Sequence, residues 1–405
     1  MFKYNAKRIF VTFSLAAGLV AGAMLPVTGQ VQGTEKAVDG NNRFAVELLQ
    51  KVDAVQQDNN IFFSPLSLST AIGMTYAGSQ GNTAKQMANT MHYAYEEEQV
   101  HKDFSALLAS LNAAGKPYTL NIANALWGQK DYYFEQKFIS LIDNYYNGGF
   151  NTVDFISQCE ASRQLINQWV AEKTNDKIKD LLLEGDLSAD TRLVLTNAIY
   201  FKGDWAVPFN PQNTFKMPFA IRPDQTVAVD TMCQTGQFRY ADTDEGKLIE
   251  LPYAGDELSM VVLVPKGSQE EFQNSLSTDK LQHLLAQAQE QKVTVFLPKF
   301  KLAARYYLEE RDLLPAMGMV DAFSQKDADF SGMTGAKDLY IAHVVHQAVI
   351  EVNEAGSEAA ASTGVVMNLK SMIPVFRADK PFVFMIMHKP TGAILFMGKV
   401  NNPQA

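Results

Sequence analysis

Residues 349–381 constrain the fold more than any other part of the chain. From Ser357 to Lys370, small or apolar residues alternate with residues that are mostly polar or small, and a period of two is the period of a β-strand. Gly356 and the alanines that follow nevertheless have low β propensity. The pattern predicts a segment that is a strand in one state and a loop in another. The alternative is a solvated linker of alanine, serine and glycine.

Apolar segments flank this stretch on both sides. Residues 339–354 are rich in β-branched side chains and predict a strand, and residues 381–400 predict two apolar strands joined by a turn at residues 389–392. Residues 193–201 form a continuous apolar run, which is typical of a strand buried on both faces. Helical and strand patterns mix without a regular βαβ repeat, so we expect an α+β fold.

Composition predicts one large globular domain. With 405 residues, of which 47% are hydrophobic and 20% charged, the chain can bury a sizeable core. No linker rich in proline, glycine or serine divides it. The formal net charge of −9 argues against nucleic acid or an anionic membrane surface as a partner.

Residues 1–29 have the plan of a secretory signal peptide. Three cations precede an apolar run from Ile9 to Leu25. Cleavage after Ala23 or Gly29 would leave a polar lead at residues 30–42, a domain at residues 43–405, and a formal charge of −12 once the three cations are lost. The alternative is an uncleaved membrane anchor, for which a run of about 17 residues is marginal. We expect a secreted protein, extracellular or periplasmic, with no membrane contact after cleavage.

No motif of a familiar catalytic centre occurs in the chain. The sequence contains no nucleophile elbow, no zinc-binding HExxH, no P-loop and no dinucleotide fingerprint. His343 and His346 lie three residues apart in a predicted strand, so they face opposite ways and a shared metal is not expected. Cys159 and Cys233 can pair in an oxidising compartment, but two separate thiols are favoured. We expect neither enzyme activity nor a cofactor.

Seven segments resemble the serpin family and occur in that family's order. They are NIFFSPLSLSTAIGM (60–74), GNTAKQM (81–87), INQWVAEKTNDKIKDLL (166–182), LTNAIYFKGDW (195–205), DADFSGM (327–333), VVHQAVIEVNEAG (344–356) and the closing PFVF…FMGKVNNP. The resemblance covers residues 44–403. It implies three β-sheets, eight or nine helices, and an exposed reactive-centre loop at about residues 354–378.

The resemblance also implies suicide inhibition of a serine endopeptidase. The protease attacks the loop as a substrate and forms an acyl-enzyme. The cleaved loop then enters the central sheet as an added strand and distorts the attached protease, which requires a metastable native fold. The residues that match the family's hinge are Glu354, Gly356, Ser357, Glu358, Ala359, Ala360, Ala361, Ser362 and Thr363.

Counting along the family's usual loop length from Glu354 places the reactive bond between Lys370 and Ser371. A lysine there suits a trypsin-like protease, whose specificity pocket carries a carboxylate. We expect no heparin site, because residues 96–102 are net acidic, and we expect a monomer. The alternative is a solvated loop lysine and a shifted bond, which would suit elastase-like, chymotrypsin-like or cysteine proteases. The candidate positions for that shifted bond are Leu369, Met367 and Met372.

Five further residues match supporting positions of the family. Ser64, Ser67, Asn197 and His346 match the shutter beneath the opening of the central sheet, and Trp205 matches the breach where insertion begins. Buried polar groups must be hydrogen-bonded, so a network that re-pairs on opening acts as a latch. The alternatives are a static polar cluster and a core tryptophan. The rival function is a serpin-fold binding protein that does not inhibit; its members tend to carry bulky or charged hinge residues, which this chain lacks.

Overall fold

A computed structural model describes residues 33–404, except residues 57, 94–95, 148 and 357–372. The predicted signal peptide, the reactive bond between Lys370 and Ser371, and the hinge residues 357–363 lie outside the described residues. No helix of the described chain has both the length and the apolar character needed to cross a membrane.

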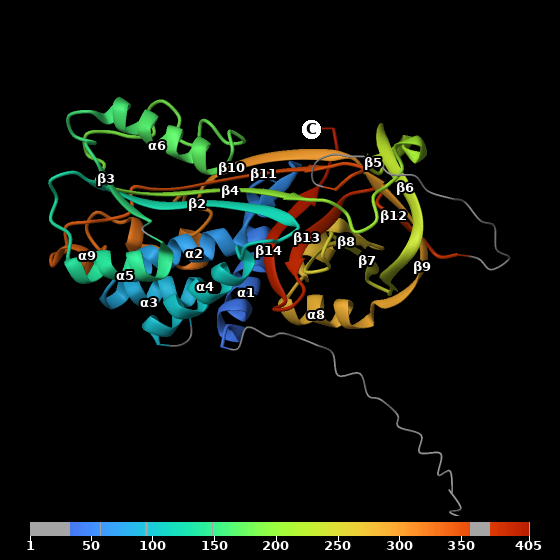
Figure 1. The fold of residues 1–405 in the computed structure, drawn as a ribbon, viewed down its shortest axis with the longest axis horizontal. Helices are drawn as coiled ribbons and strands as arrows, with labels where there is room; N and C mark the ends of the chain where they lie inside the picture. Colours follow the sequence, from blue (N-terminus) through green and yellow to red (C-terminus); the bar gives the residue numbers. More distant parts are fainter. Residues whose placement is uncertain (1–32, 57, 94–95, 148, 357–372, 405) are drawn as a thin grey trace, which may run out of the picture.

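The described chain contains nine α-helices and fourteen β-strands (Figure 1). The helices are α1 (Glu35–Val55), α2 (Pro65–Tyr76), α3 (Gly81–Thr90), α4 (Glu97–Leu111), α5 (Gln136–Tyr146), α6 (Cys159–Lys173), α7 (Gln269–Asn274), α8 (Thr278–Gln287) and α9 (Ser331–Thr334). The strands are β1 (Ile61–Phe63), β2 (Tyr118–Gln129), β3 (Phe150–Val153), β4 (Leu193–Gly203), β5 (Phe215–Arg222), β6 (Gln225–Asp242), β7 (Gly246–Pro252), β8 (Leu258–Pro265), β9 (Gln289–Pro298), β10 (Phe300–Tyr307), β11 (His343–Val352), β12 (Val375–Arg377), β13 (Phe382–His388) and β14 (Ala393–Val400). The α+β prediction is confirmed.

The smaller sheet has the strand order β10-β11-β4-β2-β3. Helix α6 covers one face of this sheet, and α2 packs against the other (Figure 1). Strand β4 therefore lies between two layers of helix. That position explains why its sequence is apolar almost throughout, as the continuous run predicted.

The larger sheet joins the second and third sheets of the prediction into one. Its order is β1-β14-β13-β8-β7-β6-β9-β12, with β5 paired to the start of β6. Strand β6 pairs with β5 near its beginning and with β7 near its end. This one long strand therefore joins two parts of the larger sheet, the part that contains β5 and the part that contains β7. The core between the sheets is aromatic: the ring of Phe62 stacks on Phe384 and Phe396 at centroid distances of 5.8 and 5.4 Å.

Local sequence signals place several boundaries correctly. Ser64 caps α2, because its hydroxyl accepts a hydrogen bond from the Ser67 amide at 3.1 Å, and Pro65 is the first helical residue. The predicted turn joins β13 to β14, and Gly392 supplies a positive φ of 74°.

One boundary differs from the prediction, and two strands were not predicted. Helix α1 begins at Glu35, so most of the predicted polar lead at residues 30–42 is helical. Ala37, Val38 and Asn41 are buried, so the face of the helix that packs against the core through Phe44 continues toward the N-terminus. Strands β5 and β6 were not predicted. Their exposed lysine, proline and glutamine residues hide the strand pattern.

Candidate functional site

The seam between β11 and β4 is the centre of the candidate site. These strands pair in parallel, from His343 opposite Val194 to Val349 opposite Tyr200. Their outer neighbours pair antiparallel, β10 with β11 and β2 with β4. Beyond Val349 the ladder between β11 and β4 ends, although both strands continue. A chain that turned back after β11 would run antiparallel to both strands of the seam.

A buried cluster of polar side chains lies across the seam beneath its middle. His346 Nδ1 donates to Asn197 Oδ1, the residue opposite it in the register. His346 Nε2 accepts a hydrogen bond from the Ser64 amide at 3.1 Å. Asn197 Nδ2 donates to Ser67 Oγ at 2.7 Å and to Asn124 Oδ1 at 2.5 Å. We call Ser64, Ser67, Asn124, Asn197 and His346 the shutter cluster.

The hydrogen bonds of the shutter cluster fix the protonation state of His346. One ring nitrogen donates and the other accepts, which only the neutral imidazole can do. Burial lowers the pKa of His346 to about 3. The side chain is 0% exposed. A proton on Nε2 would face the donating Ser64 amide, so protonation would break the contact between β11 and helix α2.

The predicted breach residue Trp205 lies at the end of the seam, where the chain leaves β11. Its indole Nε1 donates to the Asn353 carbonyl at 2.9 Å, and its amide donates to the Ala355 carbonyl at 2.8 Å. Its ring stacks on Tyr253 at a centroid distance of 4.6 Å. We call residues 353–356 the loop entrance. Trp205 is therefore a core residue that also holds the loop entrance by hydrogen bonds.

The loop entrance turns the chain back toward β4. Asn353 and Gly356 exchange backbone hydrogen bonds, and Gly356 forms an antiparallel bridge with Asp204. Gly356 has a φ of 145°, and a Cβ there would lie 2.2 Å from the Gly203 carbonyl oxygen. Only glycine fits this approach. The first residues after β11 therefore already run antiparallel to the extension of β4.

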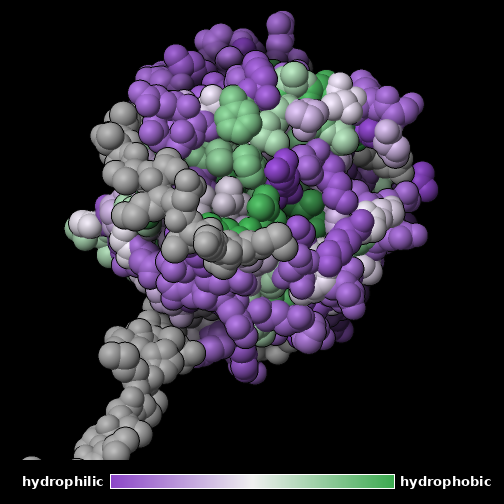
Figure 2. Space-filling model, turned by 90° about the vertical axis from the view of Figure 1, so that its right-hand side faces the viewer, coloured by the Kyte–Doolittle hydropathy of each residue, from purple (hydrophilic) through white to green (hydrophobic). Residues whose placement is uncertain are grey.

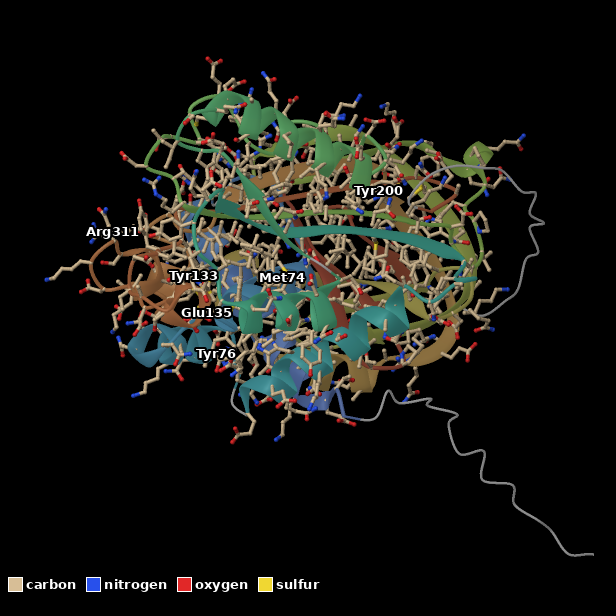
Figure 3. All side chains as sticks on the ribbon, turned by 60° about the vertical axis from the view of Figure 1, so that its left-hand side comes forward. Met74, Tyr76, Tyr133, Glu135, Tyr200 and Arg311 are labelled. Atoms are coloured by element: carbon tan, nitrogen blue, oxygen red, sulfur yellow. The ribbon has the colours of Figure 1, made fainter. Side chains whose placement is uncertain are left out.

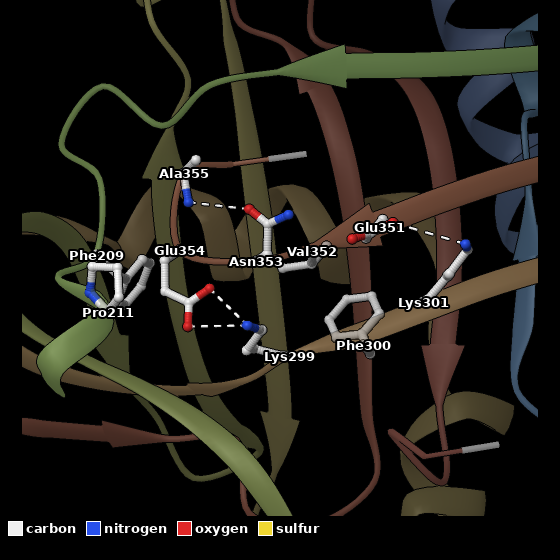
Figure 4. Close-up of a pocket in the computed structure, with 10 residues that line it drawn as sticks. All are labelled: Phe209, Pro211, Lys299, Phe300, Lys301, Glu351, Val352, Asn353, Glu354 and Ala355. Carbon is white, nitrogen blue, oxygen red and sulfur yellow. Dashed lines mark hydrogen bonds and ion pairs between the residues drawn. The ribbon is translucent and has the colours of Figure 1, made fainter. Parts of the chain in front are cut away.

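An ion pair holds Glu354 at the loop entrance (Figure 4). Lys299 Nζ lies 2.8 Å from Glu354 Oε2, and Thr214 Oγ1 donates to Glu354 Oε1 at 2.8 Å. Burial acts to raise the pKa of Glu354, but the bonds from Lys299 and Thr214 outweigh it, so the pKa is lowered. A recess of about 420 Å³ lies beside this ion pair, lined on one side by Phe300 and on the other by Phe209.

Sequence reasoning named four of the five members of the shutter cluster, and the structure brings all four together. It missed Asn124, Lys299 and Thr214, because nothing local in their segments indicates partners that lie far along the chain. His343 and His346 face opposite ways: His343 Nδ1 contacts Glu309 at 2.7 Å. Within the described residues no group of three metal-ligating side chains occurs, and both cysteines are free.

The end of the molecule that carries the loop entrance is shown in Figure 2. Apolar residues gather in a hollow on this face, and polar residues surround them. Strands β5, β6, β9 and β12 lie at this end (Figure 1). Phe215, at the start of β5, is 47% exposed.

Solved structures share the whole fold. The chain is similar to uncleaved ovalbumin, with a TM-score of 0.82 and 29% identity over 91% of this chain and 100% of that one. It is similar to human thyroxine-binding globulin in complex with its ligand, with a TM-score of 0.83 and 31% identity over 92% of this chain and 99% of that one. A family described as serpin (serine protease inhibitor) matches residues 39–403. The chain belongs to the serpin family.

Relatives that align over most of this chain include proteins named as protease inhibitors. The leukocyte elastase inhibitor of Bos taurus is 40% identical over 91% of this chain and 100% of that protein. A serpin-like protein of Thermococcus kodakarensis is 40% identical over 92% of this chain and 87% of that protein.

The prediction of a secreted protein is wrong by this comparison. The leukocyte elastase inhibitors of Bos taurus and Homo sapiens align over 100% of their own length with 91% of this chain. Because these two relatives align over their whole length, they have no counterpart of the remaining part of this chain. The family match begins at residue 39, so most of that part precedes the folded domain. The positive and apolar N-terminal pattern was the sole basis for the prediction.

Proposed function

We propose that this protein inhibits serine endopeptidases irreversibly, by insertion of its cleaved reactive-centre loop between β11 and β4. The loop would serve as a substrate, and its insertion would carry the acylated protease across the molecule before deacylation. From Ser357 to Leu369 the inserted strand would extend about 43 Å, at roughly 3.3 Å per residue. Ser357, Ala359 and Ala361 would give its leading end a face without bulky or charged groups.

The observation that carries this proposal is the closed parallel seam. An inserted strand would replace one parallel pairing with two antiparallel pairings, and parallel pairs are slightly less stable per residue. The bridge between Gly356 and Asp204 supports the proposal, because it starts the chain in the antiparallel direction at the open end of the seam. The ladder between β11 and β4 stops short of this end, so insertion would begin where no pairing must be broken.

The protease class depends on the reactive bond, and two observations favour different classes. Lys370 at the predicted bond favours trypsin-like enzymes, which bind a basic side chain through a pocket carboxylate. The relatives are named for elastase, which favours elastase-like or chymotrypsin-like enzymes and a bond beside a smaller or apolar residue. Val366 and Met367 are such residues in this loop.

A binding protein that does not inhibit is the second candidate. One similar solved structure is that of thyroxine-binding globulin in complex with its ligand, so the fold also supports binding alone. The small residues of the hinge favour inhibition over this alternative.

One experiment separates these candidates. The protein is incubated with trypsin and, in parallel, with leukocyte elastase, and the products are resolved on a denaturing gel. An inhibitor gives a covalent complex that survives denaturation, whereas a binding protein is merely clipped. Mass spectrometry of the released C-terminal fragment identifies the reactive bond: a fragment that starts at Ser371 supports Lys370. Clipping without any complex, for both proteases, would contradict the proposal.

A further inference from the structure

The segment that joins α6 to β4, residues 174–187, lies on the face of the smaller sheet that α6 covers (Figure 1). We call this segment the strap. Its side chains Ile178 and Leu182 are buried and belong to one apolar cluster with Val194 of β4 and Val345 of β11. Successive residues of a strand point to opposite faces, so the strap covers the seam on the face opposite the shutter cluster.

The strap contacts strands on both sides of the seam. On one side, the Tyr307 hydroxyl of β10 donates to Asp186 Oδ2 at 2.9 Å. On the other side, Lys177 Nζ lies 5.3 Å from the ring centroid of Tyr200 in β4, a residue labelled in Figure 3. Strand β10 is paired to β11, so a separation of β11 from β4 would stretch the strap between its two attachments.

His343, the first residue of β11, contacts both the strap and the loop that follows β10. Its Nδ1 lies 2.7 Å from Glu309 Oε1, and Glu309 is held in place because its Oε2 accepts from the Val344 amide at 3.0 Å. The backbone of Asp186 in the strap is a second hydrogen-bond partner of the ring. A carboxylate and a backbone carbonyl only accept, and two acceptors require two N–H donors, which only the protonated imidazole has.

The electrostatic surroundings of His343 favour its protonated form. The titratable and charged groups on this side of the seam come from the strap, from β10 and from the loop after β10; they are Asp186, Tyr307, Arg305 and Glu309. The residue opposite His343 on β4 is the apolar Val194. The hydrogen bond to Glu309 raises the pKa of His343, burial opposes this rise, and the charge of Asp186 adds to it. The stability that His343 contributes is therefore present below its ordinary pKa of 6.5 and is lost as the pH rises through the raised pKa.

We propose that His343 is a pH-sensitive clasp: its protonated ring holds the strap against β11 and slows the opening of the seam, and loss of the proton releases the strap. The neutral ring can still donate to Glu309 but not also to Asp186. The strap is then held on this side by Tyr307 and by Arg305, which donates to the Asp180 carbonyl. A strand that enters between β11 and β4 would meet less resistance at higher pH. The part concerning insertion rests on the proposed function.

The clasp is tested by hydrogen exchange of the strap amides in the full-length chain, with the parent and the variants compared at the same pH. The parent should protect these amides about tenfold more than His343→Gln at about pH 6, and the difference should vanish toward about pH 9. His343→Lys keeps a cation at this position, so its strap should stay more protected than that of His343→Gln at both pH values. His283→Gln, at an exposed histidine in α8, should behave as the parent.

Two results would overturn the clasp. One is equal protection in the parent and His343→Gln at the lower pH. The other is a difference that persists unchanged at the higher pH, which would show a structural role without titration.

The effect on insertion is tested with trypsin at the higher pH. The fraction of chains trapped rather than clipped should be lower for His343→Lys than for the parent, because the permanent cation keeps the strap in place. Equal fractions would contradict this effect. A parent that shows the pH-dependent protection but traps no protease contradicts the proposed function alone, and leaves the clasp standing.

Discussion

His346 donates a hydrogen bond to Asn197 directly across the seam, from β11 to β4. It is a side-chain bond between two strands that also pair through their backbones. The acceptor nitrogen of the same ring holds the start of helix α2 through the Ser64 amide. One imidazole therefore joins both strands of the seam to the helix beneath them, and its protonation state affects all three.

The stability of the fold should fall on acidification because of His346. Burial lowers its pKa from 6.5 to about 3, so the unfolded chain binds a proton at a higher pH than the folded one. The contribution of His346 is complete above about pH 6.5 and is lost progressively as the pH falls toward 3. Between pH 6.5 and 5 the loss is about 2 kcal/mol.

This pH effect is measured as a difference between two proteins. Thermal unfolding midpoints of the parent and of His346→Gln are recorded at several pH values. The other histidines are present in both proteins, and their titration cancels in the difference. The parent midpoint should fall by several degrees more than that of the variant. Parallel pH profiles would show that His346 does not titrate in this way.

Gly356→Ala should destabilise the loop entrance. The new Cβ would lie 2.2 Å from the Gly203 carbonyl oxygen, at a φ of 145°, so the bridge to Asp204 would have to separate. We expect a loss of about 1–3 kcal/mol and a lower thermal unfolding midpoint. Gly267→Ala is the control, because no atom lies within 4 Å of its added Cβ. Equal midpoints for the two variants would contradict the close approach.

Ser357→Arg should convert the inhibitor into a substrate. An arginine at the leading end of the inserted strand would be buried without a partner, at a cost of several kcal/mol. Cleavage between Lys370 and Ser371 would continue, but deacylation would outrun insertion. Glu358→Arg is the matched control, because position 358 falls on the solvent side of the predicted strand. On a denaturing gel the first variant should be clipped and the second should still form a complex. Undiminished trapping by Ser357→Arg would contradict strand insertion.

Lys370→Ala should abolish or strongly slow the trapping of trypsin, because it removes the ion pair in the specificity pocket. Trapping of an elastase-like enzyme through Val366 or Met367 would persist. Association rate constants for both enzymes measure this change, and Lys326→Ala, at an exposed lysine elsewhere, serves as the control. An unaltered rate with trypsin would place the reactive bond at another residue.

Periodic and strongly biased segments allowed most of the fold to be predicted. The apolar run at residues 193–201 predicted β4, and residues 389–392 predicted the turn between β13 and β14, because each signal is complete within a few neighbouring residues. Strand β6 escaped prediction: it passes from an exposed edge to a buried centre, so its side chains follow no single alternation. The start of the folded domain was placed too late, at residue 43, because Glu35 and Lys36 look solvated when the packing of Ala37 and Val38 is not known.

The candidate site was less accessible to sequence reasoning than the fold. Four members of the shutter cluster were predicted through the family resemblance and none through local pattern. Asn124 lies in a strand where an isolated asparagine indicates nothing about Asn197 or Ser67. Lys299 and Glu354 become an ion pair only because β10 and β11 are neighbours. Contacts of this kind depend on which distant strands pair, and no window of sequence contains that information.

The two last strands of the chain lie in the interior of the larger sheet, not at its edge. Strand β14 pairs with β1 and β13, and β13 pairs with β8. During synthesis, β1 and β8 therefore lack these partners until β13 and β14 have been made. Those edges are apolar and open to other chains in the meantime. The nascent protein thus has a vulnerable interval that lasts until β14 has been made, and a chain truncated before Ala393 would never complete its sheet.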